Sequence, residues 1–296
     1  MDIASLREKL LEFERKRHLV PLVGSGISRQ AHIPQGAEGF PMWADFLSRL
    51  VQAAASASCL TKPEVEEVHR LIKKRQFLLA AQAVRDALPC DIFSQELRRH
   101  FDPAGAQPTD IHKDILDLGS PVVLTTNYDR LLEDSFAKHR NTDALSMTYL
   151  QAGSLAQFLR KGPDELNTPC IFKMHGDVQD PEHTILTEKD YRVLLSHDIG
   201  YRNVVSGIFQ HNTVLLLGFS GDDPELSIFF RTMNEYLHKE RTPDYLLLPR
   251  GRKGRLERKL FRDYFSLEVV EYNPANNHKE LSQMVHYLAQ KARKAS

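Results

Sequence analysis

The chain has 296 residues, enough for one large α/β domain or two ordinary ones with a substantial core. Lys plus Arg and Asp plus Glu each total 39, so the formal net charge is zero, and we expect neither direct nucleic-acid binding nor a membrane partner. The cysteines form no CxxC pair and no apolar leader is present, which predicts a cytoplasmic protein without a zinc site or disulfide framework.

The predicted elements alternate between strands and helices, apart from one long helical stretch. Leucines at helical spacing predict an amphipathic helix over 3–17, and a short apolar run predicts a first strand over 19–23. From 44 to 118 the pattern is helical throughout, which predicts a helical lobe after that strand. Further apolar runs predict strands at 121–124, 170–173, 213–217, 245–248 and 267–270.

Continuous apolar strands that alternate with helices are typical of a parallel sheet covered on both faces. The predicted fold class is therefore α/β, a doubly wound Rossmann-like parallel sheet with an inserted all-helical lobe at 44–118. We expect residues 1–296 to form a single domain. The lobe carries broad Ala and Leu faces around 78–84, more than packing on one sheet edge requires, which predicts a homo-oligomer interface there.

Four polar or glycine-rich clusters follow four of the predicted strands. They are GSGIS (24–28), TNYD (126–129), KMHG (173–176) and GFSGDD (218–223). Because the carboxyl ends of parallel strands meet at one edge of a sheet, where open α/β sheets bind ligands, we expect the four clusters to form one site.

Each cluster taken alone also has a plainer structural explanation. GSGIS can be a tight strand-to-helix turn without a ligand; it is not a Rossmann fingerprint, since Arg29 occupies the third glycine position, and it is not a P-loop. Asn127, Asp129 or the GFSGDD residues can cap helices. His175 is either a base that titrates near neutrality or a hydrogen-bonded structural side chain. Convergence on one sheet edge is what favours a site.

In this order, the four clusters resemble the motifs of the sirtuin superfamily, and more closely those of its bacterial sirtuin-like branch found in antiphage defence systems. The resemblance runs from about 15 to 290 and implies an NAD site in which Asn127 holds the nicotinamide ribose and His175 is the catalytic histidine. It implies a pyrophosphate cradle at GSGIS and a carboxamide contact at Asp129. The NAD-binding positions that it implies are Gly24, Ser25, Gly26, Ile27, Ser28, Thr126, Asp129, Gly218, Ser220 and Asn273.

Two departures separate this chain from the family's protein deacylases. The deacylases carry a zinc module of two CxxC pairs, which this sequence lacks, and their GIPDFR segment reads HIPQGA (32–37) here. The resemblance therefore implies NAD as the substrate of an NAD glycohydrolase, an NAD-depleting defence effector that releases nicotinamide and ADP-ribose. The alternatives are a regulatory subunit that binds NAD or ADP-ribose without turnover, and an NAD-dependent deacylase or ADP-ribosyltransferase.

An enzyme that hydrolyses free NAD harms its own cell, so we expect its activity to be gated. The resemblance points to homo-oligomerisation or a separately encoded ATPase or sensor partner. The one basic stretch, 250–259, is either a solvated helix start or a docking surface for a partner or nucleic acid.

Overall fold

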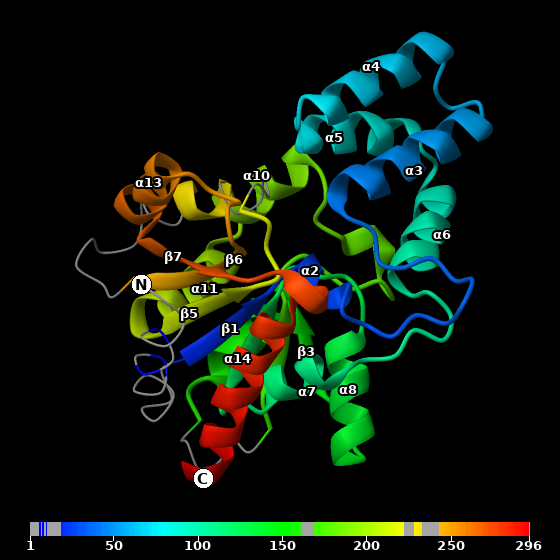
Figure 1. The fold of residues 1–296 in the computed structure, drawn as a ribbon. Coiled ribbons are helices and arrows are strands. Elements are labelled where there is room, and N and C mark those ends of the chain that lie inside the picture. Colours follow the sequence, from blue (N-terminus) through cyan, green and yellow to red (C-terminus); the bar gives the residue numbers. More distant parts are fainter. Residues whose placement is uncertain are drawn as a thin grey trace.

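The computed structural model describes residues 6, 8, 10, 19–161, 168–221, 228–232 and 243–295. In this part of the chain, seven parallel strands form one sheet in the order β3-β4-β2-β1-β5-β6-β7 (Figure 1). The strands are β1 (Leu19–Val23), β2 (Val122–Thr125), β3 (Leu145–Thr148), β4 (Cys170–Lys173), β5 (Thr213–Leu217), β6 (Asp244–Pro249) and β7 (Leu267–Tyr272). The helix predicted over 3–17 and the acidic pair at 222–223 lie almost wholly outside the described residues.

Helices connect the strands and cover the sheet. Those of the first half are α2 (Ser25–Ser28), α3 (Trp43–Ser56), α4 (Lys62–Lys73), α5 (Phe77–Ala87), α6 (Cys90–Phe101), α7 (Asp110–Leu116) and α8 (Leu131–Arg140). Those of the second half are α9 (Ala152–Phe158), α10 (Glu188–Ser196), α11 (Ile199–His211), α13 (Arg255–Phe265) and α14 (Ala275–Ala295). None of the described helices combines the length and apolarity that a membrane crossing requires.

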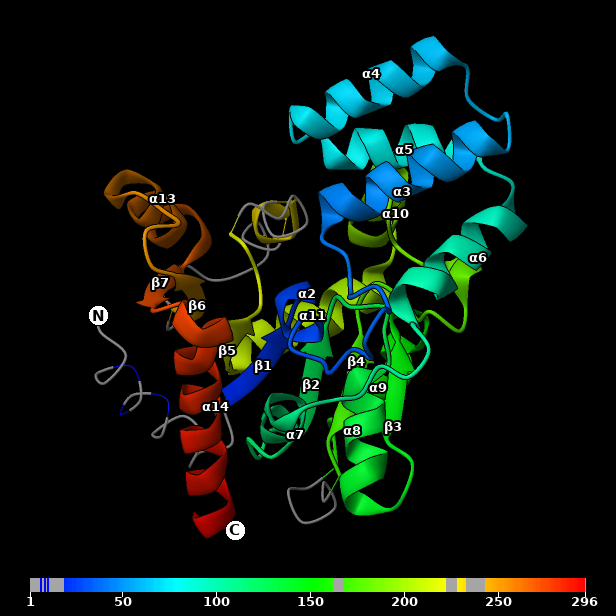
Figure 2. The ribbon, with the colours of Figure 1, turned by 45° about the vertical axis from the view of Figure 1, so that its right-hand side comes forward.

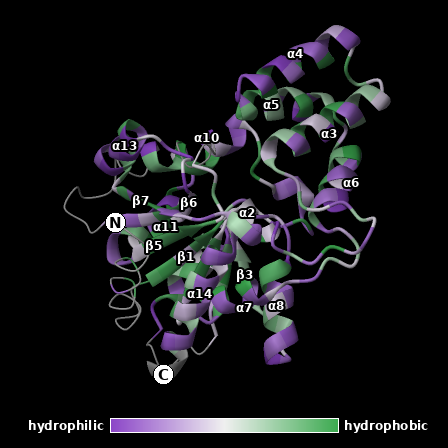
Figure 3. Ribbon diagram, viewed as in Figure 1, coloured by the Kyte–Doolittle hydropathy of each residue, from purple (hydrophilic) through white to green (hydrophobic). Residues whose placement is uncertain are grey.

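Successive residues of each strand point to opposite faces of the sheet, and helices bury both faces. On β1, Val20 and Leu22 belong to the core shared with α9, α10 and α11. Leu19 and Val23 belong to the core shared with α7, α8 and α14, which lie together beside the sheet in Figure 2. Figure 3 shows hydrophobic residues concentrated on the strands while α4 and α13 are largely hydrophilic. The predicted doubly wound α/β fold is confirmed.

The edge strand β3 is not among the predicted strands. It has four residues, and Leu145 and Met147 alternate with Ser146 and Thr148, all only partly buried. A strand at the sheet edge pairs on one side only, here with β4, so its sequence lacks the continuous apolar run that identified the interior strands. This explains why the apolar pattern missed it.

Helices α3 to α6 form a lobe between β1 and β2, at the upper right of Figure 1. The lobe has its own core, in which Leu50, Val51 and Val84 pack with residues of neighbouring segments. The Ala and Leu faces that predicted an oligomer interface are largely used inside the protein, and Leu79 alone among them is exposed. Folding itself buries most of this apolar surface, so it does not point to an interface on the lobe, and the homo-oligomer stays a prediction. The last helix of the stretch, α7, packs against the sheet and not in the lobe.

The start of α7 contains a buried histidine, His112, whose Nδ1 accepts a hydrogen bond from the Thr109 amide at 3.1 Å. Its side chain is 1% exposed, and burial lowers the pKa of His112 to about 4. The folded protein therefore keeps this imidazole neutral at about pH 5, whereas the unfolded chain binds a proton below about pH 6.5. Because the unfolded state binds more protons, stability is lost as the pH falls from about 6.5 to about 4.

We expect His112→Gln to remove part of this pH dependence. Glutamine at the same position still accepts the Thr109 amide, so the helix cap is kept. Between about pH 7.5 and about pH 5, the parent should lose about 2 kcal/mol more unfolding free energy than the variant. Urea unfolding at the two pH values measures the difference. Equal losses in both proteins would show that His112 titrates normally.

Candidate active site

The glycines of GSGIS and GFSGDD allow two turns of the backbone to touch. The Gly26 amide donates to Gly218 O at 2.8 Å, and a Cβ on Gly26 would lie 2.7 Å from that oxygen. Gly218 has φ +79°, and a Cβ there would lie 2.7 Å from the Ile27 nitrogen. Both glycines are therefore required for packing between the turns after β1 and β5. The Gly26 amide is committed to this contact, while the side chain of Ile27 is buried in the sheet core.

Asn127, just after β2, ties the TNYD turn to the GSGIS turn. Its Nδ2 donates to Gly24 O at 3.1 Å and to Ser28 Oγ at 2.8 Å. The amino group of Asn127 thus has a protein partner for each hydrogen, and Oδ1 is the amide atom left to meet a ligand. Asn127 does not cap a helix. Its placement unites the first two clusters.

Asp129 is the next member of the same chain of hydrogen bonds. Its Oδ2 accepts from Ser28 Oγ at 2.6 Å, and its Oδ1 accepts from the Leu131 amide at the start of α8. Burial raises the pKa of the Asp129 carboxyl, against the opposing effects of Lys173 and the Ser28 hydroxyl. Both carboxylate oxygens are used within the protein. Asp129 therefore holds the chain at the start of α8, although the N-cap residue of that helix is Arg130.

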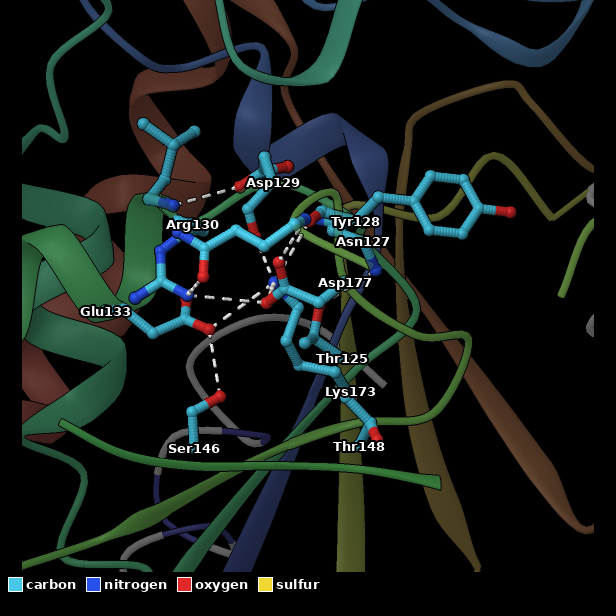
Figure 4. Close-up of polar contacts among 12 residues, drawn as sticks. Thr125, Asn127, Tyr128, Asp129, Arg130, Glu133, Ser146, Thr148, Lys173 and Asp177 are labelled. Carbon is cyan, nitrogen blue, oxygen red and sulfur yellow. Dashed lines mark hydrogen bonds and ion pairs between the residues drawn. The ribbon is translucent and has the colours of Figure 1, made fainter. Parts of the chain in front are cut away.

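Sequence reasoning missed a buried charge cluster beneath the TNYD turn (Figure 4). Lys173, the last residue of β4, is fully buried and donates to the main-chain oxygens of Tyr128 and Asp129 at 3.0 and 2.6 Å. Its Nζ also lies 2.8 Å from Asp177 Oδ2 and 3.4 Å from Glu133 Oε1. Burial lowers the pKa of Lys173, but the surrounding carboxylates outweigh burial and raise it above its ordinary value. A lysine that ends an otherwise apolar strand was the available signal.

His175 lies two residues beyond β4 and is 4% exposed. The Tyr191 hydroxyl on α10 lies 3.2 Å from its Nδ1 and 3.3 Å from its Nε2, and the two rings meet edge to face at 5.1 Å. Gly176 follows with φ +89°, and a Cβ there would lie 2.4 Å from the His183 carbonyl oxygen. Tyr191 and Gly176 together fix the position of the histidine ring.

A cavity lies among the turns that follow β1, β2 and β4 and the start of the lobe. The polar wall contains the two predicted catalytic residues, Asn127 and His175. Thr126, the first residue of the TNYD cluster, lies on the same wall. The other wall is apolar and comes from the start of the lobe and the end of α6. It consists of Phe40, Pro41, Met42, Trp43, Phe46 and Phe101.

A second cavity lies on the other side of residues 25–28, and Met42 lines both cavities. Gly218 and Ser220 line this second cavity, so the predicted NAD-binding positions divide between the two. Asn273 lines neither; its exposed side chain accepts from the Ala275 amide at 3.0 Å. Sequence reasoning missed the aromatic and basic residues of the wall, namely Arg29, Arg252, Tyr272 and His278.

The basic stretch 250–259 divides between two settings. Residues 255–259 form the first turns of α13, and the Gly254 amide is capped by Glu257 at 2.9 Å. Lys253 is buried and lies 3.1 Å from Glu257 Oε1. The second half of the stretch is thus the largely exposed start of a helix. Arg252, in the first half, lines the second cavity.

The second half of the chain matches a known protein family. A family described as the SIR2-like domain covers residues 121–269, about half of the chain. The chain belongs to the SIR2-like family. Within this SIR2-like fold, the described residues contain no group of three or more His, Cys, Asp or Glu side chains placed to hold a metal ion.

Curated relatives of this SIR2-like chain carry one name, NAD(+) hydrolase ThsA. The Enterococcus faecium protein is 22% identical over 249 residues, covering 84% of this chain and 46% of the relative. The Acinetobacter baumannii protein is 28% identical over 177 residues, covering 59% and 33%. The Bacillus cereus protein is 29% identical over 140 residues, covering 47% and 28%. The matched region thus spans less than half the length of each of these relatives.

The geometry at Asn127 predicts that an aspartate cannot replace it. A carboxylate at this position would place an oxygen against Gly24 O, and the single Ser28 hydroxyl hydrogen already serves Asp129. We expect Asn127→Asp and Asn127→Ala each to lower single-turnover nicotinamide release from NAD by about 10²-fold, the order seen for loss of a preorganised polar group.

NAD affinity, measured by calorimetry on the same Asn127 variants, should fall much less because the second cavity is untouched. Ser28→Ala is the matched control: it removes one of the two Asn127 contacts and should have a smaller effect. Parental turnover in Asn127→Asp would exclude a role for this amide in the chemistry.

Proposed function

We propose that this SIR2-like domain is an NAD glycohydrolase that cleaves the bond between nicotinamide and ribose. One observation carries the proposal: Asn127 and His175 line the same cavity, which adjoins a second cavity across residues 25–28. Two neighbouring cavities suit the two halves of a dinucleotide. The names of the curated relatives, NAD(+) hydrolase ThsA, support the same activity.

In this proposal the nicotinamide riboside half occupies the first cavity and the adenosine half the second. The pyrophosphate crosses residues 24–28 between them, near Gly24, Ser25 and Ser28. Gly218 and Ser220 line the adenosine side. Asp129 acts mainly by holding Ser28 and the TNYD turn, since both of its carboxylate oxygens are occupied. The lobe of α3 to α6 is an insertion in a single domain, and its first residues wall the nicotinamide side.

The reaction consumes one water and gives nicotinamide, ADP-ribose and one proton. Nicotinamide leaves as a neutral molecule because its ring nitrogen takes the electron pair of the broken glycosidic bond. The ribose then carries oxocarbenium character, as in glycoside hydrolysis. Asn127 Oδ1 orients a ribose hydroxyl or the attacking water, and His175 accepts the proton that this oxygen loses. The apolar wall of the cavity limits the entry of bulk water.

We further propose that the enzyme is a cytoplasmic antiphage effector that lowers cellular NAD. Its activity is gated, through association of identical chains or through a separately encoded partner, because unregulated NAD hydrolysis harms the host. Growth of cells that express the chain alone, compared with cells that also express its genomic neighbour, tests this gating. Equal NAD levels in both strains, with active protein present, count against a partner.

The test of the activity is incubation of the purified chain with NAD. We expect nicotinamide and ADP-ribose in equal amounts, with a rate unchanged by an acyl-lysine peptide. Turnover that requires the peptide and yields O-acyl-ADP-ribose identifies a deacylase instead. Calorimetric binding of NAD with no turnover in the presence of activating partners identifies a regulatory subunit. The Asn127→Ala protein is the matched inactive control.

A further inference from the structure

The second cavity has a basic wall formed by described residues that follow α2 and β6. Arg29 follows α2 and Arg252 follows β6, and both side chains line the cavity. Neither guanidinium forms a hydrogen bond or ion pair with any part of the chain that the structure describes. Among the described residues that line this cavity, none is acidic. The cavity therefore favours a ligand with negative charge.

The same cavity contains a histidine close to Arg29. His278 lines the same cavity, and its Nδ1 lies 2.8 Å from the Tyr272 hydroxyl. Burial and the neighbouring Arg29 both lower the pKa of His278. The positive charge of Arg29 therefore disfavours a second positive charge on His278. An anionic ligand would relieve the repulsion between these groups.

The position of Arg252 within the sheet indicates which part of a dinucleotide it meets. In the order β1-β5-β6, Arg252 follows β6, two strands from the GSGIS turn that follows β1. Two strand spacings amount to about 10 Å. A dinucleotide whose pyrophosphate crosses residues 24–28 would bring its adenosine ribose, and not its pyrophosphate, to Arg252.

Open α/β sheets distinguish the two nicotinamide dinucleotides at this ribose. An acidic residue accepts a hydrogen bond from the free 2′-hydroxyl of NAD, whereas an arginine accommodates the 2′-phosphate of NADP. In the part of the chain that the structure describes, the lining of the second cavity has arginine and no carboxylate. Guanidinium groups bind phosphate through paired, charge-assisted hydrogen bonds.

We propose that the second cavity binds an adenosine 2′-phosphate through Arg252, with Arg29 contributing charge, so that the substrate class includes NADP as well as NAD. This inference rests on the proposed function for its orientation of the dinucleotide. The 2′-phosphate is a dianion near neutral pH. The guanidinium of Arg252 supplies two parallel N–H donors to it, which an unphosphorylated ribose does not require.

The test uses both turnover and binding. Nicotinamide release is measured from NAD and from NADP, and calorimetry measures the binding of ADP-ribose and of 2′-phospho-ADP-ribose. We expect the parent to cleave NADP with a kcat/KM equal to or above that for NAD. Arg252→Gln should lower the NADP value, and the affinity for 2′-phospho-ADP-ribose, by about 10-fold or more. The NAD value should change less than about 3-fold, since Arg252 makes no charge-assisted contact to the unphosphorylated ribose.

Arg255→Gln is the matched control, because Arg255 is an exposed residue of the same basic stretch and does not line the cavity. This variant should leave the kcat/KM values for NAD and for NADP unchanged. A parent that binds ADP-ribose but not its 2′-phosphate overturns the proposal. Equal losses for NAD and NADP in Arg252→Gln also overturn it, since Arg252 would then contact the pyrophosphate.

The same measurements separate this proposal from the proposed activity. If neither dinucleotide is cleaved but 2′-phospho-ADP-ribose binds in an Arg252-dependent way, the activity fails and the binding site stands. If NAD is cleaved and NADP is neither bound nor cleaved, the activity stands and the 2′-phosphate site fails. If neither ADP-ribose compound binds, both proposals fail.

Discussion

His175→Ala is expected to lower nicotinamide release from NAD by about 10²–10⁴-fold, the contribution typical of a positioned base. The histidine sits on the polar wall of the first cavity beside Asn127, and its ring is held by the Tyr191 hydroxyl at 3.2 Å. Removing the imidazole leaves no group of the same chemistry to accept the proton. Single-turnover assays report the chemical step, and circular dichroism verifies that the variant is folded.

Tyr191→Phe provides a matched control for the His175 prediction. Phenylalanine keeps the edge-to-face ring contact of 5.1 Å but removes the hydroxyl that orients the imidazole. We expect a loss in kcat of about 10-fold, with the KM for NAD little changed, because Tyr191 acts through His175. Unchanged turnover in His175→Ala would mean that the histidine is structural and that the base assignment is wrong.

Lys173→Met is expected to lower the free energy of unfolding by about 3–5 kcal/mol, the cost typical of removing one partner from a buried ionic cluster. Lys173 is 0% exposed and is surrounded by Asp177, Glu133 and the main-chain oxygens of the TNYD turn. Methionine fills similar space but leaves the carboxylates and carbonyls without a donor. Because those carbonyls belong to Tyr128 and Asp129, turnover should fall as well.

Arg130→Gln is the control for the Lys173 prediction. Arg130 also approaches Asp177, at 3.6 Å, but its side chain is 32% exposed, so its loss should cost less than about 1 kcal/mol. Adding Asp177→Asn to Lys173→Met should restore part of the stability, because one of the unpaired buried charges is then neutral. Guanidinium unfolding of the parent and the variants measures these differences. Equal stabilities of Lys173→Met and the parent would contradict the electrostatic account.

Local sequence patterns were sufficient to predict the fold class and the edge of the sheet that carries the site. Buried parallel strands must be apolar on both faces, so the interior strands stood out as continuous runs, from LVPLV at 19–23 to TVLLL at 213–217. Chain direction then placed the residues after those strands together, because parallel strands end at one edge. The four clusters and the choice of Asn127 and His175 as candidates followed from this local information and from the family resemblance.

The contacts of each of those residues became visible only in the folded chain. The fold shows that both hydrogens of the Asn127 amino group are used within the protein and that Asp129 accepts from the Leu131 amide. It also shows that the Gly26 amide donates to Gly218 O. The strand β3 and the true core of the lobe depend equally on tertiary packing. Hydrogen bonds join segments far apart in the chain, 101 residues in the case of Ser28 and Asp129, and no local pattern encodes such partners. Lys173 is an example, because a lysine at the end of a strand is ordinary in sequence. Its role depends on the carboxylates and main-chain carbonyls that the fold places around it.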